Sequence, residues 1–180
     1  MNVRPARPDD ARRIAEIHVR TWQAAYPGIV PAEYLASLSI ERYEAMWSDS
    51  IAKSTPELLV AEDGDAILGW VAFGASRDKD ARSDTAEIWA IYVDSSRWSA
   101  GIGRALWSQT LARLQERGFA SVGLWAFPAN ERAGRFYRAL GFEIEAGSAQ
   151  QFVLGGASLD EVRYVRRIEA PRSRVVGAAG

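Results

Sequence analysis

Two glycines and their neighbours carry the clearest chemical signal in this sequence. Gly101 and Gly103 follow an apolar run over Ile88–Val93 and precede an amphipathic segment that ends at Gly118. This order predicts a strand, a tight turn and a helix, with little side-chain bulk where the backbone turns. Unpaired N–H groups and the positive end of the helix dipole would then bind a phosphate or pyrophosphate. The residues of this predicted site are Trp98, Ser99, Ala100, Gly101, Ile102, Gly103 and Arg104.

A second motif, Asn130–Phe142, follows further along the chain. At the helical angle of about 100° per residue, one face collects an aromatic and apolar set. Asn130 is suited to cap the start of this helix, and Gly141 is suited to end it. The set on one face comprises Asn130, Ala133, Phe136, Tyr137 and Leu140.

In this order and at this separation, the two motifs resemble the GNAT superfamily of acyl-CoA-dependent N-acetyltransferases. The resemblance extends over roughly residues 1–168 and is strongest over 85–143. It implies acetyl-CoA as cosubstrate, no metal, and direct transfer of the acetyl group to an amine. The chain has no cysteine, which agrees with a mechanism without a cysteinyl acyl-enzyme. Without the resemblance, the two motifs indicate only a phosphate-binding α/β domain.

Glu87 interrupts an otherwise apolar strand. A carboxylate there is costly unless it is paired, solvated or needed for function. In several GNAT enzymes a glutamate at the matching position helps to deprotonate the acceptor amine, directly or through a water. Glu87 is therefore the candidate base, and the alternatives are an exposed strand end or a structural ion pair. The base role predicts that Glu87→Gln lowers turnover most at low pH.

Tyr137 lies on the apolar face of the second predicted helix, where a tyrosine is commonly a core residue. The resemblance implies a catalytic role, because the matching tyrosine of GNAT enzymes donates a proton to the departing CoA thiolate. A thiol is a stronger acid than a phenol, so part of this effect would be a hydrogen bond. The resemblance also places Asn130 against the pantetheine or phosphate side of CoA, in addition to its capping role.

Other cofactor contacts follow from the same resemblance. The backbone of Ile91, Tyr92 and Val93 would pair with the pantetheine amides as a neighbouring strand does, although a plain core strand fits these residues equally. From the second helix, Ala133 and Phe136 would complete the cofactor site.

The phosphate turn departs from the family pattern at two positions. Trp98 stands where Arg or Gln is usual, and Ser99 stands where glycine is common. The backbone donors do not depend on side-chain identity, so pyrophosphate binding can survive. Arg104 is a candidate source of positive charge, and a solvated surface residue is the alternative.

Aromatic residues of the N-terminal region are candidates for acceptor binding. In GNAT folds the segments after the first strand form one wall of the acceptor site, which assigns Trp22, Tyr26 and Tyr34 to that wall. Packing between helices is the alternative for Trp22. His18 receives no role in the mechanism, because a lone histidine is more often a packed or surface residue.

Periodicity and turn residues predict the remaining elements. Asp9 or Asp10 would cap a first helix, a short helix would follow Pro31, and a third would cover about Ile40–Lys53. Asp63–Asp65 predicts a hairpin turn, and the polar stretch 76–84 predicts a mobile loop. Strands are expected at Asn2–Ala6, Leu58–Ala61, Ile67–Phe73, Thr85–Val93, Ser121–Phe127, Phe142–Ala146 and Asp160–Ile168.

These elements predict an α/β fold of the GNAT type in a single domain over residues 1–168. The sheet would be mixed, with about six or seven mostly antiparallel strands, splayed near the Val93 strand and flanked by four to five helices. The tail 169–180 lacks apolar periodicity and is predicted to be disordered.

Composition excludes several protein classes. With 180 residues, 48% hydrophobic and 25% charged, the chain fits one soluble domain. A net charge of −1 provides no electrostatic footprint for nucleic acid or an anionic membrane. The start Met1–Pro5 is not a signal peptide and no apolar run reaches transmembrane length, so a cytoplasmic location is expected.

The sequence therefore predicts an N-acetyltransferase that acts on the primary amine of a small molecule or peptide. Two alternatives stay open: a non-catalytic acyl-CoA-binding or sensing module, and a protein N-terminal acetyltransferase. Having both Glu87 and Tyr137 argues against the binding module. A different nucleotide-binding protein is disfavoured, because the turn lacks the P-loop lysine and the full dinucleotide-binding glycine pattern. The acceptor is undetermined, and a homodimer is compatible with the sequence.

Overall fold

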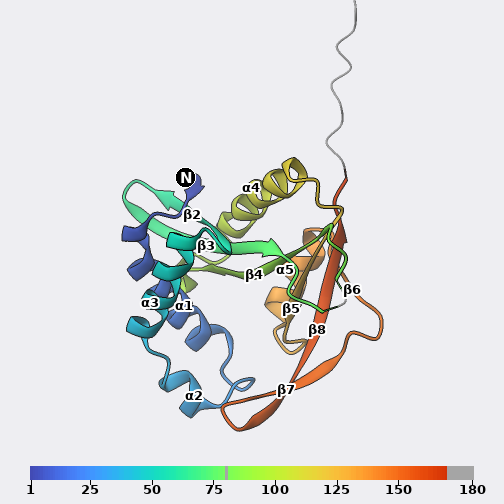
Figure 1. Cartoon of the computed structure of the whole chain (residues 1–180). Coiled ribbons are helices and arrows are strands. Elements are labelled where there is room, and N and C mark those ends of the chain that lie inside the picture. Colours follow the sequence, from blue (N-terminus) through green and yellow to red (C-terminus); the bar gives the residue numbers. More distant parts are fainter. Residues whose placement is uncertain (80, 170–180) are drawn as a thin grey trace, which may run out of the picture.

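The computed structural model describes residues 1–79 and 81–169. Its centre is a mixed sheet with strand order β1-β2-β3-β4-β5-β8-β6, and β7 pairs with β8 (Figure 1). Neighbouring strands are antiparallel except β4 and β5, which are parallel. The strands are β1 (Asn2–Pro5), β2 (Glu57–Asp63), β3 (Ala66–Ala75), β4 (Thr85–Val93), β5 (Ser121–Ala126), β6 (Glu143–Ile144), β7 (Gln150–Leu154) and β8 (Ala157–Arg167).

Helices cover both faces of the sheet (Figure 1). On one face, α1 and α3 bury Ile14 and Trp47 against Trp70 of β3. On the other, α4 buries Leu106 in the cluster that also holds Phe142 and is packed by aromatic residues of α5. The α-helices of the described chain are α1 (Ala11–Ala25), α2 (Ala32–Ala36), α3 (Ile40–Lys53), α4 (Ile102–Glu116) and α5 (Glu131–Ala139).

The predicted mixed α/β fold is confirmed, and the difference lies near its C-terminal edge. Strand β7 was not predicted, and it forms a hairpin with β8 through Gly155 and Gly156, which both have positive φ. The alternation of apolar and polar residues that would predict β7 is weak because β7 is an outer strand. Val153 is 74% exposed, so apolar residues occur on both faces of this strand. The strand expected at Phe142–Ala146 is reduced to Glu143–Ile144.

The caps of two helices show where local prediction succeeds and where it does not. The Asn130 side chain accepts a hydrogen bond from the N–H of Ala133 at 3.1 Å, so the predicted cap of α5 is confirmed. Asp10 precedes α1, but its carboxylate accepts from the N–H of Arg7 at 2.6 Å and pairs with the Arg4 guanidinium at 2.7 Å. It therefore ties β1 to the following turn and makes no capping bond to α1.

The polar loop after β3 was expected to be mobile, but its first residues are anchored. Asp78 accepts from the indole N–H of Trp125 at 3.2 Å and pairs with Arg163 of β8 at 3.2 Å. These partners lie far along the chain, so the composition of the loop gave no sign of them.

Two remaining expectations concern the tail and membranes. The predicted disordered tail lies, from residue 170 onward, outside the described residues. In the part of the chain that is described, no helix is both long and apolar enough for a membrane crossing.

Candidate active site

The parallel strands β4 and β5 separate after a short paired stretch. Thr85–Glu87 pair with Ser121–Gly123, and the described residues form no further β4–β5 pair toward Val93. The register of β4 with β3 also shifts next to Trp89, which marks an irregularity in the strand. The predicted splay is thus confirmed. From Ile88 onward, the backbone edge of β4 that faces β5 has no strand partner among the described residues and is available to a ligand.

The glycine-bearing turn lies directly after β4. Ser99 and Gly101 have φ of 66° and 82°, and α4 begins at Ile102. The N–H groups of Ile102, Gly103 and Arg104 belong to the first turn of α4, where a helix cannot supply their acceptors. Among the described residues they have no other backbone acceptor. These three groups therefore form a candidate anion site at a helix N-terminus.

Gly103 also has a packing role. A Cβ at this position would lie 3.0 Å from the Phe136 ring of α5. The missing side chain therefore allows the aromatic face of α5 to approach the start of α4. The two sequence motifs are joined in space by this contact.

Trp98 is a supporting residue at this turn. Its indole N–H donates to the Val93 carbonyl at 3.0 Å, and the Thr21 hydroxyl donates to the same oxygen at 3.1 Å. The Arg132 guanidinium lies over the Trp98 ring, 4.0 Å from its centroid. The Val93 carbonyl is thus already engaged, and a cation from α5 lies beside the turn. No spacing in the sequence indicated the contact between Arg132 and Trp98.

Three tyrosines come together next to the gap. Burial raises the pKa of Tyr137, and Tyr26 and Tyr164 shift it in the same direction. Burial also raises the pKa of Tyr92, whose hydroxyl accepts from the Trp22 indole N–H at 2.9 Å. The pKa of Tyr26 is raised by burial, although hydrogen bonding to the Tyr92 and Asn130 side chains lowers it in part. All three phenols therefore stay protonated at neutral pH and can donate hydrogen bonds.

Glu87 is buried and paired. It is 3% exposed, and its carboxylate accepts from the N–H of Arg77 at 2.9 Å and forms an ion pair with the guanidinium of the same residue. That guanidinium also lies 4.3 Å from the centroid of the Trp89 ring. The ion pair that the sequence left as an alternative is therefore present. Both carboxylate oxygens accept from Arg77, so a base at this position would share its lone pairs with that arginine.

The predicted acceptor residues belong to a larger aromatic row. Trp22 and Tyr26 meet edge to face with ring centroids 5.0 Å apart, and Tyr26 meets Phe127 in the same way at 5.1 Å. Phe127 then stacks with Phe152 of β7 at 5.9 Å. Sequence reasoning missed Phe127 and Phe152. The position of Phe127 at the end of a predicted strand was the only available signal for either residue.

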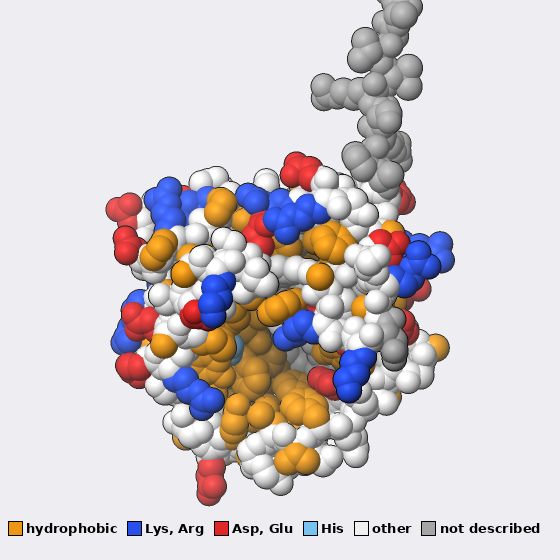
Figure 2. Space-filling view, viewed as in Figure 1, with side chains coloured by type: hydrophobic (Ala, Val, Ile, Leu, Met, Phe, Trp, Pro, Cys, Tyr) orange, Lys and Arg blue, Asp and Glu red, His pale blue; other side chains and the backbone are white. Residues whose placement is uncertain are grey.

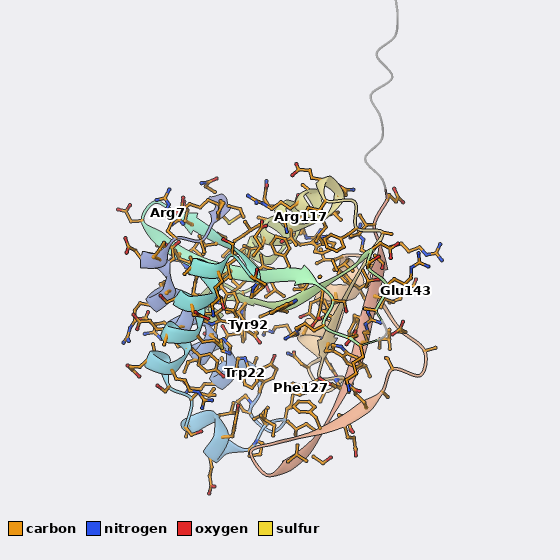
Figure 3. All side chains as sticks on the ribbon, in the orientation of Figure 1. Arg7, Trp22, Tyr92, Arg117, Phe127 and Glu143 are labelled. Carbon is orange, nitrogen blue, oxygen red and sulfur yellow. The ribbon has the colours of Figure 1, made fainter. Side chains whose placement is uncertain are left out.

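This row borders a hollow in the molecular surface. Figure 2 shows an opening lined mainly by hydrophobic side chains, with charged groups toward its rim. In Figure 3, Trp22, Tyr92 and Phe127 lie around the same central opening, although they come from α1, β4 and the end of β5. Each of the three is half-buried.

Tyr34 lies at the edge of this region, where it contacts the turn between β7 and β8. A Cβ on Gly155 would lie 2.7 Å from the Tyr34 Cβ, so the turn between β7 and β8 packs tightly on α2. The structure therefore places Tyr34 in a contact between α2 and the hairpin. Its ring is also 6.3 Å from that of Trp22, which keeps it beside the aromatic row.

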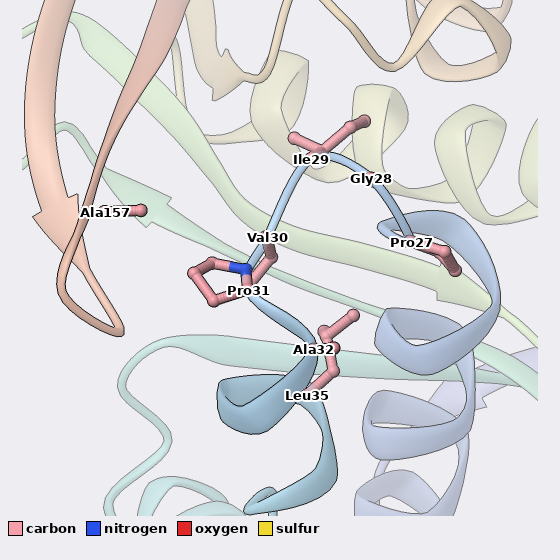
Figure 4. Close-up of a pocket in the computed structure, with 8 residues that line it drawn as sticks. All are labelled: Pro27, Gly28, Ile29, Val30, Pro31, Ala32, Leu35 and Ala157. Atoms are coloured by element: carbon pink, nitrogen blue, oxygen red, sulfur yellow. The ribbon is translucent and has the colours of Figure 1, made fainter.

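An open pocket of about 570 Å³ lies between the α1–α2 loop and Ala157 (Figure 4). None of the residues assigned above to catalysis or to the cofactor lines it. Several of its residues share one apolar cluster with Trp22 and Tyr26, so the apolar lining of the acceptor side continues into it. The pocket is lined by Pro27, Gly28, Ile29, Val30, Pro31, Ala32, Leu35 and Ala157.

His18 lies behind the aromatic row. It is 6% exposed, its Nδ1 accepts from the Trp47 indole N–H at 3.3 Å, and burial lowers its pKa to about 3. The imidazole is therefore neutral at pH 7, and its proton is assigned to Nε2 because Nδ1 is an acceptor. This agrees with the assignment of no proton-accepting role to His18.

A family match covers most of the chain. The sequence model described as "Acetyltransferase (GNAT) family" matches residues 12–142. An uncharacterized N-acetyltransferase of Bacillus subtilis, YuaI, is 32% identical over 163 residues, which are 90% of each chain.

Solved structures share the fold. The PaiA N-acetyltransferase of Thermoplasma acidophilum, in complex with coenzyme A, superposes with a TM-score of 0.75 at 19% identity, covering 92% of this chain and 98% of its own. YncA of Salmonella typhimurium, solved with its cofactor acetyl-CoA, gives a TM-score of 0.73 at 23% identity, covering 96% and 98%.

Proposed function

Because the chain belongs to the GNAT family of acetyltransferases, we propose that it transfers the acetyl group of acetyl-CoA to a primary amine of a small molecule. The observation that carries this proposal is the gap between β4 and β5. The unpaired edge of β4 and the free N–H groups at the start of α4 adjoin this gap, and we propose that the Tyr137 phenol reaches it. We further propose that residues 1–168 act as one domain.

The cofactor would be held mainly by the backbone. The N–H groups of Ile102, Gly103 and Arg104 would bind the pyrophosphate, and Arg132 would supply positive charge from its position over Trp98. The pantetheine would pair with free backbone groups of Ile91, Tyr92 and Val93, excluding the engaged Val93 carbonyl. From α5, Asn130, Ala133 and Phe136 would border the cofactor.

The reaction requires that the acceptor amine lose a proton and that the leaving CoA sulfur be offered one. The neutral amine nitrogen attacks the thioester carbonyl, so that an N–C bond forms while the C–S bond breaks. The proton lost by the amine passes to Glu87, directly or through a water, and the leaving sulfur receives a hydrogen bond or proton from Tyr137. A backbone N–H near Tyr92–Val93 would stabilise the oxyanion. Because burial raises the pKa of Tyr137 further above that of a thiol, hydrogen bonding contributes more than full proton transfer.

A thiol-release assay with acetyl-CoA and a panel of amines tests this function. The expected result is amine-dependent release of CoA that falls sharply in Tyr137→Phe and Glu87→Gln. Binding of CoA, seen as a thermal shift, without transfer to any amine would instead support a non-catalytic acyl-CoA-binding module.

A further inference from the structure

The aromatic row indicates the chemistry of the acceptor. On the basis of the proposed function, we infer that the acceptor is a small primary amine with an aromatic or apolar body and a single amino group, rather than a polyamine or an aminoglycoside. Trp22, Tyr26, Phe127 and Phe152 form the wall that would receive this body.

The wall is continuous and belongs to several elements. Its ring centroids are 5.0, 5.1 and 5.9 Å apart in order from Trp22 to Phe152. All four rings are half-buried, so each retains surface for a ligand. The hydrophobic lining of the hollow in Figure 2 agrees with this chemistry. An aromatic amine would therefore bury its ring against these side chains, where rings in contact attract each other beyond the effect of area burial.

Three carboxylates of β4, of the loop after β3 and of the segment after β6 are already paired with arginines. Glu87 pairs with Arg77, while Asp78 and Glu145 pair with opposite sides of Arg163 at 3.2 and 3.1 Å. Asp78 also accepts from the Trp125 indole N–H. A polyamine or an aminoglycoside brings several ammonium groups that need carboxylates when they leave water. These three carboxylates are already neutralised by arginines and are not free to bind several ammonium groups.

An apolar wall would also assist the reaction. Removing an ammonium group from water lowers its pKa, which increases the fraction of neutral, nucleophilic amine. The amine would reach the gap beside Tyr92, whose hydroxyl accepts a hydrogen bond from Trp22 of the wall. The body of the acceptor would extend away from the gap toward Phe127.

The primary test compares acceptors with the wild-type protein at saturating acetyl-CoA. The panel contains 2-phenylethylamine, hexylamine, spermidine, an aminoglycoside and a phenylalanine-containing dipeptide. We expect kcat/KM for 2-phenylethylamine to exceed that for spermidine at least tenfold, with hexylamine between them. A preference for spermidine or the aminoglycoside overturns the inference and leaves the transferase intact. A preference for the dipeptide overturns the assignment to a small molecule, and transfer to no amine overturns the proposed function as well.

Two variants test the wall itself. Phe127→Glu introduces a carboxylate into it and should lower the ratio of kcat/KM for 2-phenylethylamine over spermidine at least tenfold. Trp22→Phe keeps an aromatic ring but removes the donor to Tyr92, so it should raise KM for 2-phenylethylamine a few-fold. Val153→Ala is the matched control, because this neighbour of Phe152 is 74% exposed and should leave both values unchanged. An unchanged ratio in a folded Phe127→Glu protein contradicts the inference.

Discussion

The two sides of the gap between β4 and β5 are built from different parts of the polypeptide. On the α4 side, the groups offered to a ligand are main-chain N–H groups that a turn and a helix hold in place. On the α1 side, the surface consists of aromatic side chains from α1, the end of β5 and β7.

The two sides therefore tolerate different kinds of substitution. Trp98 can stand where arginine is usual because the backbone donors remain, and a cation from α5 lies over its ring. The aromatic side has no such independence, because every contact there is a side chain. We therefore expect substitutions on the α4 side to change binding of the cofactor, and those on the α1 side to change the choice of acceptor.

Tyr137 is the proposed acid of the reaction, and its loss should have the largest effect. Replacing Tyr137 with Phe should lower kcat about 100-fold, which is typical of a lost acid–base group, and should change KM for acetyl-CoA less than about twofold. Steady-state kinetics with a saturating acceptor measures both constants. Tyr164→Phe is the control, since this ring lies 5.3 Å from that of Tyr137 in the same cluster. Full turnover by the Tyr137 variant would remove its catalytic role.

Variants of Glu87 and of its partner Arg77 distinguish a role as catalytic base from a role in positioning the loop after β3. If it is the base, Glu87→Gln should lower kcat about tenfold at pH 6.5 and less at pH 9, where the amine loses its proton more readily. Arg77→Gln removes the ion-pair partner of a buried carboxylate while keeping the carboxylate, so kcat should fall less than in Glu87→Gln although the protein is less stable. Equal losses in the two variants, with the same pH–rate profile, would show that the pair only positions the loop after β3.

His18 should make the free energy of unfolding of this protein sensitive to acid. Its folded pKa of about 3 lies below the unfolded value of 6.5, so between these values the unfolded chain binds more protons. The free energy of unfolding therefore rises with pH through this window and levels off above it. Between pH 7.5 and 5.5 the wild type should lose about 1.4 kcal/mol from this group.

Urea unfolding at both pH values measures the effect of His18. The variant His18→Phe removes the titration, so the difference between its two unfolding free energies should be smaller by that amount. Because the comparison is made within each protein, an overall change in stability does not affect it. Identical pH dependence in both proteins would contradict the buried, neutral state of His18.

Arg132 should have the smallest effect, and one confined to the α4 side. Arg132→Ala should raise KM for acetyl-CoA about threefold at low salt and less at high salt, because the side chain is exposed and its charge is screened. Acceptor KM should not change. Arg135→Ala is the control on the same helix, since its guanidinium pairs with Glu131. Equal effects of the two variants would indicate a general charge effect and no specific role over Trp98.

Elements encoded in consecutive residues were predicted well. The predicted bounds Ile40–Lys53 and Thr85–Val93 coincide with α3 and β4. Asn130 caps α5 through a bond to a residue three positions away, which is within reach of a local pattern. By contrast, β7 was missed because its partner strand and half-exposed position, rather than its own periodicity, stabilise it.

Short-range spacing and glycine conformation were enough to predict the turn after β4, the helix after that turn and the motif of α5. Three contacts became visible only in the folded chain: Arg77 with Glu87, Arg132 with Trp98, and Phe127 with Tyr26. In the last two contacts the partners lie far apart along the chain, and in the first a charged loop residue folds back onto a strand. Such contacts depend on how the sheet and helices pack, which residue spacing alone does not encode.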